Sequence, residues 1–241
     1  TSSVKTILKY NLATTVYEEA KRYNYEGISN YKKVTLTDEQ SSIVNEVVSS
    51  FNTSSTYLLY GVTGSGKTEV YMSIIEEALK KNKTAIMLVP EISLTPQIVG
   101  KFISRFGSVI AVLHSKWSDT ERYDEYRKIT NSEAKIVIGT RSAIFVPFSN
   151  IGVIIIDEEH TSSYKQENHP RYNAKDIAKW RSQYHKCPVV MGSATPSLES
   201  YARASKGVYN LLSLTMRAKE QALPTVNIVD MRAELKNGNR S

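Results

Sequence analysis

A glycine-rich segment of the sequence, Gly61-Val62-Thr63-Gly64-Ser65-Gly66-Lys67-Thr68, has the residue types and spacing that bind phosphate. It fits the pattern G-x-x-x-x-G-K-[ST] throughout. Glycines let the backbone curl so that successive N–H groups face phosphate oxygens, and a following helix adds the partial positive charge of its N-terminus. We expect Lys67 to reach the β- and γ-phosphates of a nucleotide and the Thr68 hydroxyl to ligate Mg²⁺. The residues expected to bind the nucleotide are Gly61, Thr63, Gly64, Ser65, Gly66, Lys67 and Thr68.

An acidic group, Asp157-Glu158-Glu159-His160, follows directly after the apolar run 151–156. Open α/β sheets place ligands at the carboxyl ends of their strands, so we expect Asp157 to hold Mg²⁺ directly or through water. Glu158 is placed to orient or deprotonate an attacking water. His160 is expected to be a coupling residue and not a metal ligand. The alternative is a solvated acidic turn, which the presence of a phosphate-binding pattern in the same chain disfavours. ATP and Mg²⁺ are therefore the expected cofactors.

The elements that would position these residues alternate regularly along the chain from Thr35 onward. Apolar runs that are rich in β-formers alternate with helical patterns, which predicts an α/β fold with a mostly parallel sheet and helices on both faces. The expected strands are 57–60, 84–89, 109–113, 135–138, 153–156 and 188–191. The expected helices are 38–50, 68–81, 95–106, 118–129, 174–184 and 197–204.

Composition narrows the class of protein. The 241 residues carry a net charge of +7, which weakly favours a polyanionic partner. Cys187 is the only cysteine, so an internal disulfide or a cysteine-rich zinc site is excluded; we expect it to be a buried small hydrophobe. No apolar run is long enough to cross a bilayer and no secretory signal opens the chain, so a cytoplasmic protein without a membrane partner is expected. The chain begins without methionine, and we interpret it as a fragment.

The two phosphate-site motifs and four further segments resemble superfamily-two helicases and translocases. The segment 89–97 (VPEISLTPQ) is similar to motif Ia of that superfamily, 139–143 (GTRSA) to motif Ib, and 192–196 (GSATP) to motif III. The segment 37–40 (TDEQ) resembles a Q motif, which implies that Gln40 recognises adenine, since an amide pairs with its N6/N7 edge. The resemblance implies a RecA-like lobe at 34–216, with Ser193 and Thr195 linking nucleotide state to DNA.

The residues 61–71, 89–97, 139–145, 157–160 and 163–176 are most similar to primosomal replication-restart helicases. The likeness implies an ATP-dependent 3′–5′ DNA helicase that remodels stalled forks and loads the primosome. It implies DNA forks, single strands, primosome proteins and single-strand-binding protein as partners. Residues 1–33 would be a winged-helix remnant and linker, with an overhang left from cloning as the alternative, and 217–241 a connection toward a second lobe. The second lobe and a zinc-binding C-terminal part are missing, so we expect this chain to bind ATP·Mg but hydrolyse it poorly.

Positive charges and aromatic rings alternate within residues 161–186. Rings stack on unpaired bases while cations follow phosphates, which indicates a single-strand contact. Thr140 and Arg141 follow an expected strand and are predicted to grip phosphate, with a structural turn as the alternative. The expected loop contacts are Tyr164, Lys165, Gln166, Arg171 and Tyr172. Trp180 and Tyr184 are four apart on an expected helix, so we expect one or both in the core.

Two alternative functions remain for the chain as a whole. It would be a lobe of a related repair or branch-migration translocase, or a non-catalytic module that binds DNA or the primosome.

Overall fold

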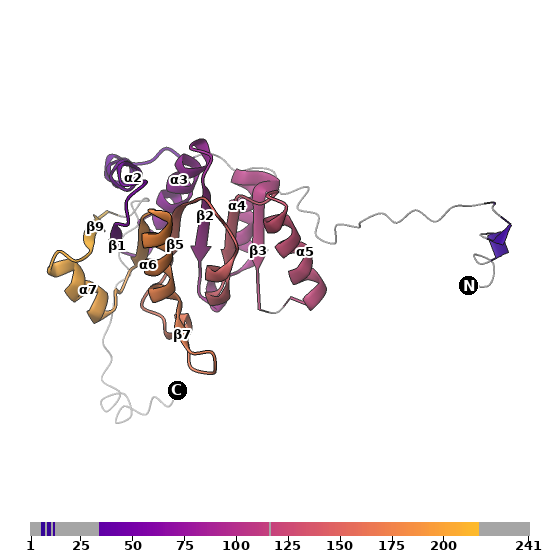
Figure 1. Ribbon diagram of the computed structural model, residues 1–241. Coiled ribbons are helices and arrows are strands. Elements are labelled where there is room, and N and C mark those ends of the chain that lie inside the picture. Colours follow the sequence, from indigo (N-terminus) through magenta and orange to yellow (C-terminus); the bar gives the residue numbers. More distant parts are fainter. Residues whose placement is uncertain (1–5, 8, 11, 13–33, 116, 217–241) are drawn as a thin grey trace, which may run out of the picture.

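The computed structural model describes residues 6, 7, 9, 10, 12, 34–115 and 117–216 (Figure 1). The predicted winged-helix remnant at 1–33 lies almost wholly outside the described residues. The predicted connection at 217–241 lies outside them altogether. The elements below all fall within residues 34–216.

A seven-stranded sheet forms the centre of the molecule, in the order β3-β4-β2-β5-β8-β1-β9, and every pairing in it is parallel. The six expected strands are confirmed to within a few residues, whereas β9, at the edge beside β1, was not predicted. The strands are β1 (Thr56–Gly61), β2 (Thr84–Leu88), β3 (Ile110–Leu113), β4 (Ile136–Gly139), β5 (Ile151–Ile156), β8 (Val189–Ser193) and β9 (Asn210–Leu214).

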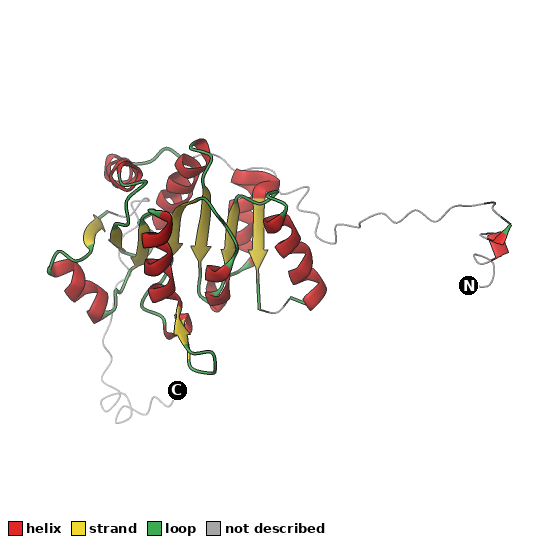
Figure 2. Ribbon diagram, in the orientation of Figure 1, coloured by secondary structure: helices red, strands yellow, loops and turns green. Residues whose placement is uncertain are grey.

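Helices cover both faces of the sheet, as predicted (Figure 2). Helices α2, α3 and α4 pack on one face, with residues such as Val47, Tyr71 and Phe102 in the core. Helices α5, α6 and α7 pack on the other face, with Ile129 and Ala178 in the core. The helices are α2 (Asp38–Ser49), α3 (Lys67–Lys80), α4 (Pro96–Phe106), α5 (Asp119–Thr130), α6 (Ala174–His185) and α7 (Leu198–Ser205).

Polar side chains at the N-cap start most of these helices. Thr37 and Ser118 form capping boxes with residues three positions later, and Ser197 caps α7. Such caps satisfy backbone N–H groups that have no partner inside the helix. Helix α3 differs, because its N-cap is Gly66 in the left-handed region (φ 86°) and no side chain caps it. The N-terminus of α3 is thus the one that suits a ligand.

The carboxyl ends of the neighbouring strands β5, β8 and β1 meet at one edge of the sheet. A small hairpin of β6 (Lys165–Gln166) and β7 (Tyr172–Asn173) projects beyond this edge (Figure 1). Single turns of 3₁₀ helix follow some of the strands at the same edge: η1 (Glu91–Ser93), η3 (Arg141–Phe145) and η4 (Ser162–Tyr164); a fourth, η2 (Gly107–Val109), precedes β3. Within the described part of the chain, no helix is long and apolar enough to span a bilayer.

Candidate nucleotide site and nucleic-acid interface

The glycine-rich loop joins β1 to α3 and depends on glycine at three positions. Gly64 and Gly66 have φ values of 83° and 86°, which side chains rarely tolerate. At Gly61, an added Cβ would lie 2.7 Å from Ser65 Oγ. The loop therefore curls back on itself as the sequence pattern predicted.

The polar groups of this loop are arranged for an anion. Lys67 Nζ donates to the carbonyl of Gly61 at 2.6 Å, so the ammonium lies over the loop. Ser65 Oγ is the one buried side-chain N or O atom without a hydrogen-bond partner in the described ranges. Such an orphaned atom costs free energy unless a ligand completes it. Thr68 lies in the first turn of α3, and Thr63 is exposed. These features fit the phosphates of a nucleotide.

Asp157 continues β5 and lies close to the start of α3. Its backbone N–H donates to Leu88 O at 2.9 Å, and its Oδ1 accepts the Tyr71 hydroxyl at 2.9 Å. Burial raises the pKa of Asp157, while the Tyr71 hydrogen bond and the nearby Lys67 ammonium act in the opposite direction. The same burial, with the Asp157 charge, raises the pKa of Tyr71 well above its usual value, so Tyr71 remains a donor. A cation at this partly desolvated carboxylate would be stabilised.

The donor set fits Mg²⁺ held together with a nucleotide. The Thr68 hydroxyl and the Asp157 carboxylate are oxygen ligands, which Mg²⁺ prefers. Among the described residues there is no cluster of three or more His, Cys, Asp or Glu side chains that could hold a metal. Mg²⁺ usually binds through one or two carboxylates and completes its shell with phosphates and water, so this sparse set is sufficient.

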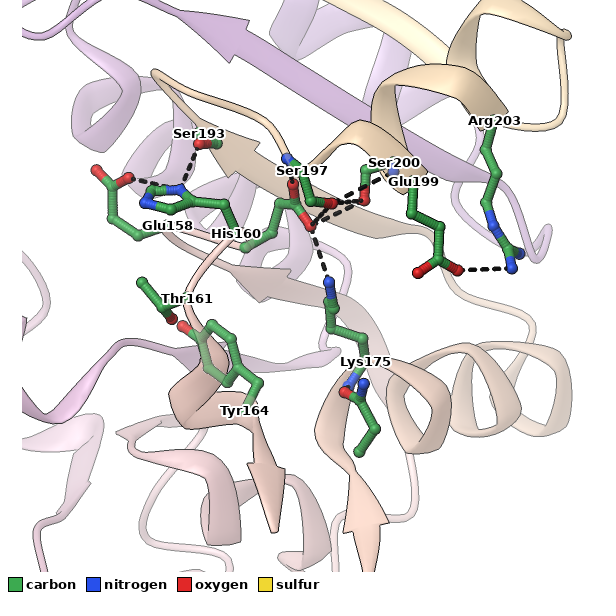
Figure 3. Close-up of polar contacts among 12 residues, drawn as sticks. Glu158, His160, Thr161, Tyr164, Lys175, Ser193, Ser197, Glu199, Ser200 and Arg203 are labelled. Atoms are coloured by element: carbon green, nitrogen blue, oxygen red, sulfur yellow. Dashed lines mark hydrogen bonds and ion pairs between the residues drawn. The ribbon is translucent and has the colours of Figure 1, made fainter. Parts of the chain in front are cut away.

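His160 connects the acidic group to the end of β8. Its Nδ1 lies 2.8 Å from Ser193 Oγ and 3.5 Å from Glu158 Oε2 (Figure 3). The Ser193 hydroxyl in turn accepts the Thr195 N–H at 2.9 Å. Glu158 itself has a φ of 46°, a backbone conformation that is costly for a side chain of this type. The three residues predicted to couple the motifs, His160, Ser193 and Thr195, are thus brought together.

Glu159 was given no role by the sequence and is the most connected member of the acidic group. It is fully buried, and its Oε2 accepts from Lys175 Nζ at 3.0 Å and Ser200 Oγ at 2.8 Å. Its Oε1 accepts the Ser197 N–H at 2.7 Å, at the start of α7. Although burial opposes it, these bonds hold the pKa of Glu159 below its usual value. Glu159 ties the acidic group to α6 and α7.

Gln40 was expected to recognise adenine, and the structure uses its amide differently. Its Oε1 accepts the Thr37 N–H at 3.0 Å in the capping box of α2, and its Nε2 donates to Ser65 O at 2.9 Å. The side chain is buried. Both the oxygen and the nitrogen of the amide form hydrogen bonds with backbone groups, so we correct the expectation. In this structure Gln40 supports the phosphate-binding loop through the carbonyl of Ser65.

The β6–β7 hairpin presents charged side chains at the same edge of the sheet. A surface pocket of about 540 Å³ is lined by Lys165, Gln166, Arg171 and Tyr172 together with acidic neighbours. Arg141 supports the hairpin: its guanidinium donates to Lys165 O at 2.7 Å and Ser163 O at 3.2 Å and lies 5.7 Å from the Tyr172 ring centre. Arg141 and the half-buried Thr140 therefore lie beside the predicted loop contacts.

Two expectations about aromatic residues are wrong. Tyr164 was expected to face DNA, but it is 1% exposed and its hydroxyl donates to Asp157 O at 2.5 Å. One or both of Trp180 and Tyr184 were expected in the core, but they are 62% and 72% exposed and stack on each other with ring centres 5.7 Å apart. The expectation for Cys187 is confirmed: it is buried, which raises the pKa of its thiol to about 12.

Comparison of the sequence with protein families and with curated proteins indicates helicases in both cases. The family model of the DEAD/DEAH box helicases matches residues 37–204. Among curated proteins, Replication restart protein PriA of Bacillus subtilis is 54% identical over 245 residues, covering 100% of this chain and 30% of that protein. The protein of the same name from Synechocystis is 51% identical, covering 76% of this chain and 23% of its own length. The chain thus spans about a quarter to a third of these relatives.

Solved structures support the fold. RecG bound to a three-way DNA junction superposes with a TM-score of 0.54 at 25% identity, over 78% of this chain and 24% of that one. T4 UvsW gives a TM-score of 0.53 at 14% identity, over 88% of this chain and 44% of that one. These likenesses confirm the predicted RecA-like lobe.

Proposed function

Because the chain belongs to the DEAD/DEAH box helicase family, we propose that it is the ATP-binding lobe of a 3′–5′ DNA helicase for replication restart. The identity of 54% to a replication restart protein supports this choice over a repair or branch-migration translocase. The single observation that carries the proposal is the meeting of three motifs at one sheet edge. There Lys67, Asp157 and the His160–Ser193 pair lie at the ends of adjacent strands.

The proposed chemistry is hydrolysis of the γ-phosphate of ATP, in which positioning and electrostatics dominate. Bound Mg²⁺ supplies charge neutralisation for the phosphates. The loop N–H groups and Lys67 hold the β- and γ-phosphates, and Thr68 and Asp157 provide the cation's protein ligands. Glu158 orients or deprotonates the attacking water. His160 contacts both Glu158 and Ser193, so it is placed to relay the state of the site to β8.

The proposed DNA contact lies on the β6–β7 hairpin, which Arg141 holds in place. Lys165 and Arg171 are exposed there and attract phosphates, while Tyr172 and Gln166 line the adjacent pocket. Arg141 acts mainly by holding the hairpin, since its guanidinium is bonded to backbone carbonyls. Stalled forks and single strands are the proposed substrates. Primosome proteins and single-strand-binding protein are the proposed partners of the longer protein, and zinc belongs to its C-terminal part.

This chain by itself is expected to be a poor enzyme. In related motors a second lobe supplies arginines to the γ-phosphate, and the loss of such a group costs about 10³–10⁵ in rate. The chain should therefore bind ATP·Mg and hydrolyse it slowly. Turnover comparable to that of a complete helicase would contradict this expectation.

The decisive experiment compares this chain with a version extended through a second lobe. ATP hydrolysis is measured for both, with and without forked DNA, and Lys67→Ala is made in each. The proposal expects strong DNA stimulation only in the extended version and its loss in the variant. If neither version hydrolyses ATP while both bind DNA and Lys67→Ala changes nothing, the chain is a non-catalytic binding module.

Polarity is tested with the extended version on duplexes that carry one single-stranded tail. Unwinding from a 3′ tail on the translocated strand, and none from a 5′ tail, is expected. The reverse preference would overturn the assigned direction while leaving the nucleotide site intact.

A further inference from the structure

Tyr71 connects the helix of the phosphate-binding loop directly to the acidic group. It lies on α3, three residues after Thr68, and its side chain is fully buried. Its hydroxyl donates to Asp157 Oδ1 at 2.9 Å. One oxygen of the carboxylate is thus held by the same helix that begins with Lys67 and Thr68.

The path of the Tyr71 side chain depends on a glycine in the third motif. Gly192 lies on β8, between β1 and β5 in the sheet. A Cβ added at Gly192 would lie 1.6 Å from the Tyr71 hydroxyl oxygen and 2.8 Å from its Cζ, distances that no side chain can accept. Gly192 O also accepts the Glu159 N–H at 3.0 Å. Only glycine at this position leaves room for the phenol to cross β8 and reach Asp157.

A second tyrosine fixes the backbone of Asp157 independently of its carboxylate. The Tyr164 hydroxyl donates to Asp157 O at 2.5 Å and to Leu88 O at 3.2 Å. Tyr164 therefore positions the main chain, and Tyr71 the carboxylate. Because the two hydroxyl groups act on different atoms of one residue, their effects can be separated by experiment.

We propose that Tyr71 is a positioning residue for the cation that accompanies the nucleotide, and that Gly192 is required for Tyr71 to reach its place. The inference rests on the proposed function of the site. The Tyr71 hydrogen bond at Oδ1 fixes the orientation in which the Asp157 carboxylate would bind the cation or its water. Partners that orient a metal ligand typically change metal affinity by about 10- to 100-fold when they are removed.

The test uses Tyr71→Phe, which keeps the ring and removes the hydroxyl, in the whole chain. Mn²⁺ replaces Mg²⁺ as a probe, and its affinity in the presence of ADP is measured by electron paramagnetic resonance. Tyr71→Phe is expected to weaken Mn²⁺ binding by about 10- to 100-fold. ADP binding in excess EDTA should stay at the wild-type value.

Tyr164→Phe is the matched control, because it removes a hydroxyl from the backbone of the same residue. It should lower the melting temperature and leave Mn²⁺ affinity unchanged. Wild-type Mn²⁺ affinity in Tyr71→Phe, or equal losses in both variants, would overturn the inference. If the wild-type chain with ADP binds no Mn²⁺ at all, the proposed function fails first.

Gly192→Ala tests separately whether Tyr71 needs glycine at this position. It should displace Tyr71 and lower Mn²⁺ affinity as much as Tyr71→Phe does, and the double variant should lose no more than either single one. Additive losses would mean that Gly192 acts apart from Tyr71. Should Gly192→Ala not fold, the comparison of the two phenylalanine variants still decides the question.

Discussion

Glu158 and Glu159 are neighbours in the sequence with opposite surroundings. Glu158 is half-exposed beside His160, whereas Glu159 is fully buried and accepts hydrogen bonds from two helices. The two side chains are therefore placed differently: Glu158 is open to solvent beside His160, and Glu159 links the acidic group to α6 and α7. The sequence suggested a role for Glu158 alone; the role of Glu159 depends on its contacts with α6 and α7, which no local pattern contains.

Removal of the Glu159 carboxylate is expected to destabilise the fold. Glu159→Ala leaves Lys175, which is 19% exposed at its side chain, without its partner. Loss of one member of a buried ion pair costs about 3–5 kcal/mol, and partial exposure of Lys175 places the expected loss near the lower value. Urea unfolding of the chain measures it.

Glu199→Ala is the matched control for this experiment. Glu199 pairs with Arg203 on the exposed side of α7, where its side chain is 70% exposed (Figure 3). Exposed pairs contribute little, so the unfolding midpoint should hardly move. Equal shifts in the two variants would contradict the structural role given to Glu159.

Several elements were predictable because their patterns are local. A buried parallel strand shows as a continuous apolar run, and caps such as Thr37 and Ser118 mark helix starts. The β6–β7 strands have two residues each, too few to leave a pattern. The exposure of Trp180 was missed because the core face of α6 is made of small residues and one arginine. Those buried residues are Ala174, Ala178, Arg181 and Ser182.

The edge strand β3 is protected by a side chain from α5. The Val112 N–H, which faces away from β4, donates to the buried Glu125 Oε2 at 2.8 Å, and Lys128 pairs with the other oxygen. A carboxylate in this place occupies a group that would otherwise be free to pair with another strand. Burial raises the pKa of Glu125, against the opposing bonds from Lys128 and Val112.

This shift predicts a pH dependence of stability with a definite sign. A carboxyl group whose pKa rises on folding contributes most stability below its unfolded pKa, near 4.5, and loses it as pH rises through the folded value. The free energy of unfolding of the wild type relative to Glu125→Gln should therefore fall as pH increases above 4.5. Urea titrations at several pH values measure it. Glu46→Gln, on the exposed side of α2, should follow the wild type; a rising difference for Glu125→Gln would contradict the argument.

The hairpin depends on Arg141 in a way that limited proteolysis can detect. Arg141→Ala removes the hydrogen bond to the hairpin carbonyl of Lys165, a second one to Ser163 O just before the hairpin, and the contact with Tyr172. Tryptic cleavage after Lys165 and Arg171, followed by mass spectrometry, should become several-fold faster. Arg203→Ala, which loses its contacts with Glu199 and with the Tyr209 ring just before β9, serves as the control. Unchanged cleavage after Lys165 would show that the hairpin keeps its shape without Arg141.

The net charge of +7 acts at the scale of the whole molecule. Binding of a single strand should weaken as salt increases, with a slope of about 0.7 per neutralised phosphate on logarithmic axes. Lys165→Gln and Arg171→Gln should each reduce that slope by about this amount, as measured by fluorescence anisotropy between about 50 and 200 mM salt. Lys80→Gln, at the opposite end of α3 from the site, should leave the slope unchanged. Equal effects of all three would indicate general charge attraction and no defined contact.

The residues of the candidate nucleotide site could be named from the sequence, whereas the side chains that support them could not. Lys67 and Asp157 belong to short motifs that can be recognised from the types of a few consecutive residues. Gln40, Tyr71 and Tyr164 act through contacts with residues far along the chain. Such contacts depend on which helix faces which strand, and no local pattern contains that information.

The position of β1 has a consequence for synthesis of the chain. β1 lies between β8 and β9, which follow it by roughly 130 and 150 residues. Ribosomes add about 5–20 residues per second, so β1 waits about 7–30 s for its neighbours. During that interval β1, the apolar strand that precedes the phosphate-binding loop, lacks both of its neighbours in the sheet and is accessible to chaperones. The phosphate-binding loop therefore reaches its final surroundings only after β8 and β9 have been synthesised.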